Sequence, residues 1–466
     1  MATAQTGGSE LKRTDGKSMI SSERAFLIRF FGRLDAEGVR YAVARKWESL
    51  PDSLNGSDLD IATSDERNLL AVLGVAKDTA KECDGGVVSF YRVEGVALCL
   101  GGCLHDGTWW GCHIDIFTGF RFHGFEYIDD VVVWRGIVRE KNSFFRCGKF
   151  VDTIAFLKEL LANGHDRKGY AVGARREYAE DKDTMLDALV AKFGECQRAI
   201  LVNLLECPYS EGALKAVSRR LYRALMFEYI RRNGLVRFIF VKMRNYWRRA
   251  IRLFRRPGFC IAFLGTDGAG KSTLIESVKP PIERMLHTKV HYEHLRPNIL
   301  PSLARLVGKP VKVGPTIDPH GGKVSGWIES LARFAYYYFD YVVGYWVKIY
   351  PILVKRASMV LFDRYYYEYM IDPRRCAVKL PHGWARFWSW FIPKPDLILC
   401  LGGDPEKIYA RKPETSLEEV KRQVVALKKF CDGNRRAVWI DTTTSVEESM
   451  NAALATITQR MSKRYK

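Results

Sequence analysis

The sequence predicts an α/β protein in which an α+β domain is followed by a doubly wound parallel sheet. Two observations lead to this prediction. In the C-terminal half, short apolar strands alternate with helical segments, and the first strand ends in a glycine-rich loop. In the N-terminal half, runs of β-branched and aromatic residues are separated by Gly and Asp turns. With 466 residues, the chain is long enough for two domains and a connector.

The domain boundaries are predicted from shifts in composition. Residues 1–19 are small and polar and are expected to form a disordered tail. Residues 20–200 are assigned to the α+β domain, and residues 201–257 to a basic helical connector. Pro257 and the glycine after it end the helical pattern, so the second domain is expected to cover residues 258–466.

The N-terminal domain is expected to open with a helix over Glu23 to Glu37. Clusters of β-branched and aromatic residues then predict strands at Tyr41–Ala44, Leu59–Ala62, Val87–Val93, Val96–Leu100, His113–Phe117 and Val131–Trp134. A helical region begins near Val151, where apolar residues recur at helical spacing.

The predicted connector carries much of the net charge of +20. From Lys215 to Arg256 there are fourteen basic residues and a single acid, Glu228, and aromatic residues stand among the arginines. Such helices bind acidic lipid headgroups, nucleic acid or an acidic partner, or simply bridge two domains. Among these we expect a weak peripheral contact with an anionic membrane, and we do not expect nucleic acid as a partner.

A glycine-rich loop follows the apolar strand Phe259–Leu264. Its sequence, Gly265-Thr266-Asp267-Gly268-Ala269-Gly270-Lys271-Ser272, has the G-x-x-x-x-G-K-[ST] spacing of a phosphate-binding P-loop and leads into a helix. The glycines allow backbone N–H groups to turn inward onto phosphate oxygens. We therefore expect Lys271 to neutralise the terminal phosphates of ATP and Ser272 to bind Mg²⁺. The residues predicted to bind ATP through this loop are Gly265, Gly268, Gly270, Lys271, Ser272 and Thr273.

An acidic residue on a neighbouring strand usually completes such a magnesium site. Met359–Asp363 is an apolar run that ends in an acid, so Asp363 is the predicted second ligand. Arg364 follows it and could place a guanidinium group against the transferring phosphoryl group. The alternation continues with the strands Asp396–Leu401 and Ala437–Asp441 and the helix Pro405–Arg411, and ligands of such sheets bind at the carboxyl ends of the strands.

These segments resemble a known family. The loop, the segment Phe362-Asp363-Arg364-Tyr365-Tyr366-Tyr367, the run Pro395–Leu401 and Val438-Trp439-Ile440-Asp441 are similar to thymidylate kinases, and more narrowly to the thymidylate kinase-like proteins of bacterial surface-polysaccharide gene clusters. The resemblance implies a kinase that uses ATP and Mg²⁺. It implies that Asp267, Lys271 and Arg364 act at the acceptor and the phosphates, and that Arg411 with Lys412 lies in the lid that closes over ATP.

The segment between the loop helix and Asp363 is longer than in a thymidylate kinase, which leaves the acceptor open. Arg296 lies in this segment and could hold an acceptor phosphate with two parallel hydrogen bonds. Tyr337 and Tyr341 belong to an aromatic run and could stack on a base or a sugar ring. The alternative is that the aromatic run is a helix packed in the core and that Arg296 is a surface residue.

Three acidic residues of the N-terminal half could form a second site. Asp58 and Asp60 are separated by one residue at the start of a strand, so both point to one face, and Asp115 lies on another strand. Three such carboxylates can hold Mg²⁺ about a triphosphate. The arrangement resembles the nucleotidyltransferase superfamily that includes DNA polymerase beta, but Gly56-Ser57 directly precedes Asp58 instead of standing some ten residues earlier. The alternative is that these three carboxylates are ordinary surface acids that bind no metal.

The predicted function is phosphoryl transfer from ATP, with Mg²⁺, to a nucleoside monophosphate similar to dTMP or to a sugar-bearing acceptor. Lys271, Asp267, Asp363 and Arg364 are the predicted catalytic residues. Two alternatives stay open: nucleotidyl transfer by the N-terminal domain, and a nucleotide-gated scaffold. Eleven scattered cysteines without metal-ligand spacing, and no signal segment, favour a cytoplasmic protein, peripheral at most to the inner face of the membrane. A homodimer is one option for its oligomeric state.

Overall fold

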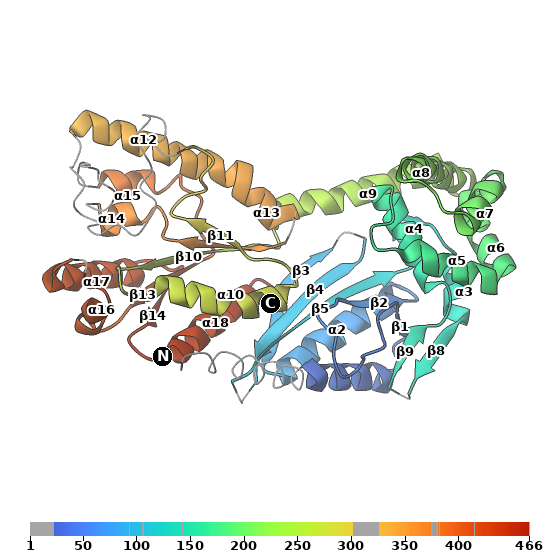
Figure 1. The fold of residues 1–466 in the computed structure, drawn as a ribbon, viewed down its shortest axis with the longest axis horizontal. Coiled ribbons are helices and arrows are strands. Elements are labelled where there is room, and N and C mark those ends of the chain that lie inside the picture. Colours follow the sequence, from blue (N-terminus) through green and yellow to red (C-terminus); the bar gives the residue numbers. More distant parts are fainter. Residues whose placement is uncertain are drawn as a thin grey trace, which may run out of the picture. The chain divides into compact units, whose positions relative to one another are not determined.

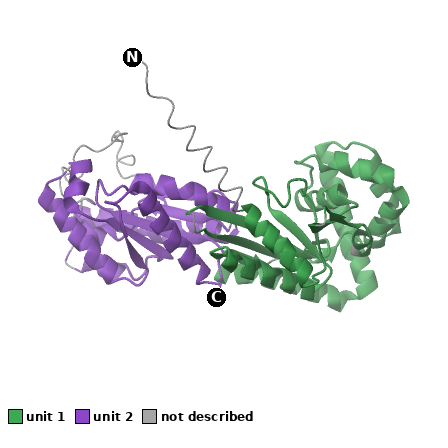
Figure 2. Ribbon diagram, turned by 90° about the horizontal axis from the view of Figure 1, so that it is seen from below, with its two compact units in different colours: residues 1–254 green, residues 255–466 purple. Residues whose placement is uncertain are grey.

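The computed structural model describes residues 23–465, except residues 93, 105–106, 142, 302–325, 356, 374–375, 377, 379–380, 382 and 414. The predicted tail, residues 1–19, lies outside the described residues. The chain forms two compact units, Met1–Phe254 and Arg255–Lys466 (Figure 2). Unit 1 contains a mixed seven-stranded sheet and unit 2 a five-stranded parallel sheet, so the chain has the predicted α/β class.

The large sheet of unit 1 combines parallel and antiparallel pairs in the order β3-β4-β5-β2-β1-β9-β8 (Figure 1). At its centre β2 pairs with β5 in parallel, while β3, β4 and β5 form an antiparallel meander. A small hairpin, β6 and β7, follows β5. The strands are β1 (Tyr41–Val43), β2 (Leu59–Thr63), β3 (Gly85–Arg92), β4 (Val96–Cys103), β5 (Trp109–Thr118), β6 (Arg121–Phe122), β7 (Phe125–Glu126), β8 (Ile137–Glu140) and β9 (Phe144–Cys147).

Two helices pack on one face of this sheet. Residues 23–36 are helical, and Phe26 stacks on Trp110 of β5 with ring centroids 5.0 Å apart. Beside it lies α2 (Glu66–Glu82), which contacts β2, β3, β4 and β5. The remaining helices of unit 1 are α3 (Asp130–Arg135), α4 (Val151–Asn163), α5 (Tyr170–Glu180), α6 (Lys182–Phe193), a 3-10 turn (Glu195–Gln197), α7 (Arg198–Glu206), α8 (Glu211–Asn233) and α9 (Leu235–Phe254).

One predicted strand of unit 1 is wrong. Val131–Trp134 is part of α3, because the Asp129 side chain accepts a hydrogen bond from the Val131 backbone N–H and starts a helix there. A run of three β-branched residues and a tryptophan is too short to outweigh such a cap. Among the side chains of this helix that the structure describes, only Val133 is buried in the core.

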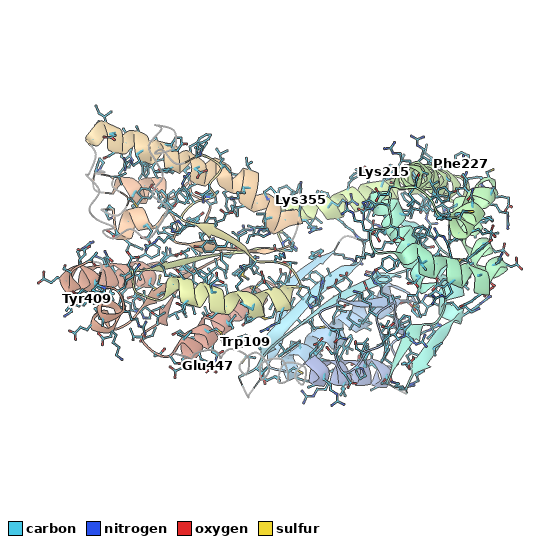
Figure 3. The ribbon with its side chains drawn as sticks, viewed as in Figure 1. Trp109, Lys215, Phe227, Lys355, Tyr409 and Glu447 are labelled. Carbon is cyan, nitrogen blue, oxygen red and sulfur yellow. The ribbon has the colours of Figure 1, made fainter. Side chains whose placement is uncertain are left out.

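Residues 201–254, predicted as a separate connector, pack in unit 1. Leu204 of α7, Leu221 and Leu225 of α8 and Val241 of α9 are buried in the same core cluster as Leu157 of α4. Apolar residues of α8 therefore hold its basic residues on the surface of the unit. Other side chains point outward, as Figure 3 shows for Phe227, which is 69% exposed. Within the described residues, no helix is both long and apolar enough to cross a bilayer.

All five strands of the unit 2 sheet run in parallel, in the order β11-β12-β10-β13-β14. The strands are β10 (Phe259–Gly265), β11 (His291–His294), β12 (Met359–Asp363), β13 (Leu397–Gly402) and β14 (Ala437–Asp441). The three central strands, β10, β12 and β13, are fully buried, as expected for apolar strands covered on both faces.

Helices cover both faces of this sheet (Figure 1). On one face α10 and α18 contact each other and the strands. On the other, Ala262 and Leu264 pack in a core cluster with Leu353 of α13 and Leu427 of α17. The helices are α10 (Lys271–Leu286), α12 (Trp327–Gly344), a π-helical turn (Tyr345–Ile349), α13 (Tyr350–Lys355), α14 (Glu368–Ile371), α15 (Trp384–Trp388), α16 (Pro405–Arg411), α17 (Leu417–Asp432) and α18 (Val446–Ser462).

Asp340 of α12 is fully buried and organises the segment that follows β11. Its carboxylate pairs with Arg296, 2.5 Å away, and accepts hydrogen bonds from the backbone N–H groups of residues 298, 299 and 300. A buried carboxylate with this many donors compensates the cost of removing both charges from water.

The Asp340→Ala variant should destabilise unit 2 by about 3–5 kcal/mol, because Arg296 then stays buried without its counter-charge. Urea unfolding measures the loss. Phe339→Ala is the control, since the neighbouring Phe339 is 53% exposed and its removal should change stability by about 0.5 kcal/mol or less. Equal unfolding midpoints for the two variants would contradict the role given to Asp340.

Candidate functional site

The glycine-rich loop of unit 2 connects β10 to α10 at the carboxyl end of the parallel sheet. Gly268 and Gly270 have φ angles of +81° and +73°, which favour glycine. Gly268 also has close neighbours: a Cβ atom there would lie 2.7 Å from the carbonyl oxygen of Ile408 in α16. A Cβ atom on Gly265 would lie 2.8 Å from the Leu401 carbonyl oxygen. The loop conformation and its packing therefore both require glycine.

Lys271 is the first residue of α10 and is buried beneath the loop. Its Nζ donates hydrogen bonds to the carbonyl oxygens of Gly265 and Thr266, at 2.8 and 2.7 Å. Burial, and then the charge of nearby Arg364, lower the pKa of Lys271 to about 7. A bound polyphosphate would add to the negative charge of Asp267, Glu368 and Asp363 near this ammonium group.

Arg364 is held between two carboxylates at the end of β12. Its Nη2 lies 2.7 Å from Asp267 of the loop, and its Nη1 lies 2.9 Å from Glu368 of α14. Its backbone has a φ of +70° and donates to the Phe263 carbonyl oxygen of β10. Burial alone lowers the pKa of this guanidinium, but the charges of Glu368 and Asp267 outweigh that effect and raise it. Arg364 is thus a fixed cation beside the loop.

Asp363 closes the other side of the site, because β12 pairs with β10 so that Asp363 lies opposite Phe263. Its Oδ2 accepts a hydrogen bond from the Tyr292 hydroxyl at 3.2 Å, while its buried Oδ1 has no hydrogen-bond partner among the described residues. Burial and the Asp363 charge raise the pKa of Tyr292 to about 12. A buried carboxylate oxygen without a donor is suited to a divalent cation, so the residues present fit Mg²⁺.

The remaining ATP-site predictions lie on or near the loop. Ser272 and Thr273 are exposed on the first turn of α10. Arg411 ends α16 and donates to the Thr442 carbonyl oxygen at 2.7 Å. Since α16 packs on Gly268, Arg411 belongs to an element that touches the loop. Their roles toward ATP stay predictions.

The predicted acceptor residues lie in the aromatic layer around α12. Arg296 is buried in the pair with Asp340 and stacks over the Tyr337 ring, 4.6 Å from its centroid. Tyr341 is 1% exposed, and its hydroxyl donates to the Leu295 carbonyl oxygen. The Tyr341 ring is covered by Tyr365 and Tyr366, so it packs in the core and has no open face for a ligand. This placement of Tyr341 corresponds to the core alternative, but Arg296, which that alternative makes a surface residue, is buried.

The three acids of unit 1 lie together at one edge of the β2 and β5 pair. Asp60 is directly opposite Asp115 in the parallel register, and Asp58 immediately precedes β2. Each carboxylate, however, is close to a cation of the chain. Asp60 pairs with Arg45, and His113 lies 2.9 Å from Asp58 and 3.4 Å from Asp115.

His113 is a residue of this cluster that the sequence interpretation did not assign. Burial alone lowers its pKa, but hydrogen bonds to Asp115 and Asp58 and their charges raise the pKa of His113 to about 10. Mg²⁺ would have to compete with a charged imidazole and with Arg45 for these oxygens. The cluster therefore fits Mg²⁺ less well than Asp363 does. His113 and Asp115 are two residues apart on one strand, so their side chains point to the same face, and this spacing could have identified His113 from the sequence.

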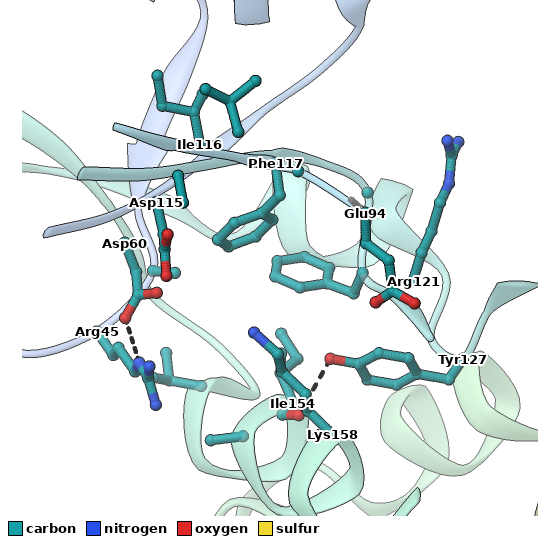
Figure 4. Close-up of a pocket in the computed structure, with 18 of the residues that line it drawn as sticks. Arg45, Asp60, Glu94, Asp115, Ile116, Phe117, Arg121, Tyr127, Ile154 and Lys158 are labelled. Atoms are coloured by element: carbon teal, nitrogen blue, oxygen red, sulfur yellow. Dashed lines mark hydrogen bonds and ion pairs between the residues drawn. The ribbon is translucent and has the colours of Figure 1, made fainter. Parts of the chain in front are cut away.

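A cavity of about 220 Å³ opens beside Asp60 and Asp115 (Figure 4). Phe117, Tyr127 and Ile154 give it apolar walls, and Lys158 points into it between the acids and the aromatic rings. The cavity also contains Glu94, whose pKa is raised by burial. It has the mixture of apolar walls and a few charged groups that is typical of a small-molecule site.

Neither the protein-family models nor the curated proteins with which the chain was compared give a match.

Alanine substitutions at the two loop glycines should separate backbone strain from steric conflict. Gly270→Ala should lower the free energy of unfolding by about 1–2 kcal/mol. Nothing lies within 4 Å of the added Cβ, so the strain comes from the positive φ alone. Gly268→Ala should cost more, since its Cβ also meets the Ile408 carbonyl oxygen. Chemical unfolding of both variants measures the difference, and equal losses would show that α16 moves away from the loop at no cost.

Proposed function

We propose that unit 2 is a doubly wound P-loop kinase that transfers a phosphoryl group from ATP, with Mg²⁺, to a nucleoside monophosphate or a sugar-bearing acceptor. The observation that supports it best is the convergence of Lys271, Asp363 and the Arg364–Asp267 pair at the carboxyl end of adjacent parallel strands. Phosphoryl transfer needs positioned charge more than covalent chemistry, and this group supplies both signs of charge.

Each residue of the group has one task in the proposal. The loop N–H groups and Lys271 bind the β- and γ-phosphates, and Lys271 exchanges its two carbonyl partners for phosphate oxygens. Arg364 places positive charge against the γ-phosphoryl group as it moves. Asp267, a residue of the loop, accepts a hydrogen bond from Arg364, and its proposed task is to orient the acceptor. Asp363 and Ser272 would hold Mg²⁺, which neutralises charge on the phosphate oxygens when bound.

Glu368 has a positioning role in the same proposal. It is 4% exposed, and Arg364 Nη1 is its ion-pair partner at the start of α14. With Glu368 on one side and Asp267 on the other, the guanidinium plane is fixed before any ligand binds. Such preorganisation lowers the cost of arranging charge during the reaction.

The Lys271→Ala variant should lose at least about 100-fold in turnover, because a charge that contacts the transferred group is removed. ADP release, measured with Mg²⁺ against nucleoside monophosphates and sugar phosphates, tests this. Lys429→Ala, an exposed lysine of α17, is the matched control and should keep full activity. A panel in which one acceptor stimulates ADP release would also name the substrate, whereas undiminished activity of Lys271→Ala would overturn the proposal.

Nucleotidyl transfer in unit 1 is the second candidate function. It is favoured by the register that places Asp60 opposite Asp115 at the edge of the 220 Å³ cavity. The cations beside these acids weigh against it, since Mg²⁺ would have to displace them.

The two candidates separate in one assay of pyrophosphate release. If unit 1 is the catalyst, Asp115→Asn and Asp58→Ala should each reduce release by at least about 100-fold, because both remove ligands of the metal-bound triphosphate. Lys271→Ala should leave that release unchanged. No pyrophosphate from the wild-type protein with any nucleoside triphosphate would remove this candidate.

A further inference from the structure

The helix α9 turns its apolar side away from the unit to which it belongs. At about 100° per residue, Val236, Phe240, Met243, Trp247 and Phe254 fall on one stripe of its surface. All five side chains are between 63% and 87% exposed. An amphipathic helix of a globular domain normally buries such a stripe against the core.

The opposite side of α9 attaches it to unit 1 through both apolar and polar residues, and Phe238 stacks on Phe125 with ring centroids 5.5 Å apart. Val241 and Asn245 are the buried residues of the helix. Lys242 donates to the Tyr222 hydroxyl at 2.8 Å, and the Arg252 guanidinium stacks over the Tyr91 ring, 4.5 Å from its centroid. These contacts thus fix the orientation in which the apolar stripe faces outward.

Arginines border the exposed stripe along one edge. Arg237 and Arg244 are exposed, and Arg248 is half-buried in the same row. The nearest acid in the sequence is Glu228, which is buried between Arg231 and Arg232. The surface therefore combines apolar and aromatic side chains with positive charge and offers no exposed carboxylate between Lys215 and Arg256.

We propose that α9 is an in-plane membrane helix that binds the surface of an anionic bilayer. Its apolar stripe would enter the boundary between headgroups and acyl chains, while the arginine row contacts lipid phosphates. Spanning is excluded for α9, because six of its residues are basic and its hydropathy is too low. A second copy of the chain is a poorer occupant, since pairing two such faces would bring arginine rows of a protein with net charge +20 together.

The test is flotation of the full-length protein with vesicles of phosphatidylcholine alone or with phosphatidylglycerol. The wild type should float with the anionic vesicles and far less with the neutral ones. Phe240→Glu and Trp247→Glu should each weaken this binding at least about tenfold, because a charge then enters the apolar stripe. Arg244→Glu should weaken only the preference for anionic lipid. Val425→Glu is the control, an equally exposed apolar residue on α17, and should bind as the wild type does.

Two further readouts make the result decisive. Brominated lipid should quench tryptophan fluorescence, and Trp247→Phe, which keeps the apolar stripe, should bind normally but lose part of the quenching. The wild type should stay monomeric without vesicles by light scattering. A wild-type dimer that Phe240→Glu converts to a monomer would assign the face to a second copy and overturn the proposal. No flotation of the wild type, or flotation abolished by Arg244→Glu but unaffected by Phe240→Glu, would also overturn it.

Discussion

The arrangement of unit 2 depends on the double ion pair of Arg364. This single side chain joins the end of β12 to the glycine-rich loop through Asp267 and to α14 through Glu368, and its backbone N–H is bonded to β10. Because the guanidinium is only 5% exposed, both carboxylates need it as a counter-charge, and the loop is fixed by the same contact that fixes the cation. A site assembled this way is charged and rigid before any ligand arrives. In the proposed phosphoryl transfer, this rigidity would favour stabilising the moving phosphoryl group over binding the ground state.

Much of unit 2 could be predicted from its sequence because the relevant signals are local. Met359–Asp363 and Ala437–Asp441 are strands with the bounds that their apolar pattern predicts, and the helix Pro405–Arg411 begins at an Asp404 cap. The loop itself is a contiguous motif. Partners distant in sequence could not be predicted: nothing local links Tyr292 to Asp363, or Arg296 to an aspartate 44 residues later. The wrong strand at α3 of unit 1 has a different, local cause: the capping residue Asp129 lies just outside the apolar run that indicates a strand.

The two acidic sites show why a residue pattern alone does not establish a metal site. In unit 1 the pattern of three carboxylates on neighbouring strands is complete, yet the fold brings Arg45 and His113 against the same oxygens. In unit 2 a single aspartate follows a common apolar strand, a weaker pattern, but burial leaves one of its oxygens without a donor among the described residues. Affinity for a cation depends on the donors that are already present, and these become visible only when the side chains are placed.

The helix α9 illustrates the same limit at a surface. Its composition indicates a basic amphipathic helix, and composition alone allows it to bridge domains, to bind a polyanion or to lie on a membrane. The structure narrows these options because it shows which side is attached to unit 1. Phe238, Val241, Lys242 and Arg252 contact the unit, and the aromatic stripe is left outside. A helix that only bridges two domains would need only the contacts of its attached side. A helix that binds a polyanion would need only its arginines. Neither of these two options explains why Trp247 and Phe254 are 68% and 87% exposed. A membrane surface offers an apolar phase bordered by phosphate groups, and it accounts for the exposed aromatic stripe as well as for the arginines beside it.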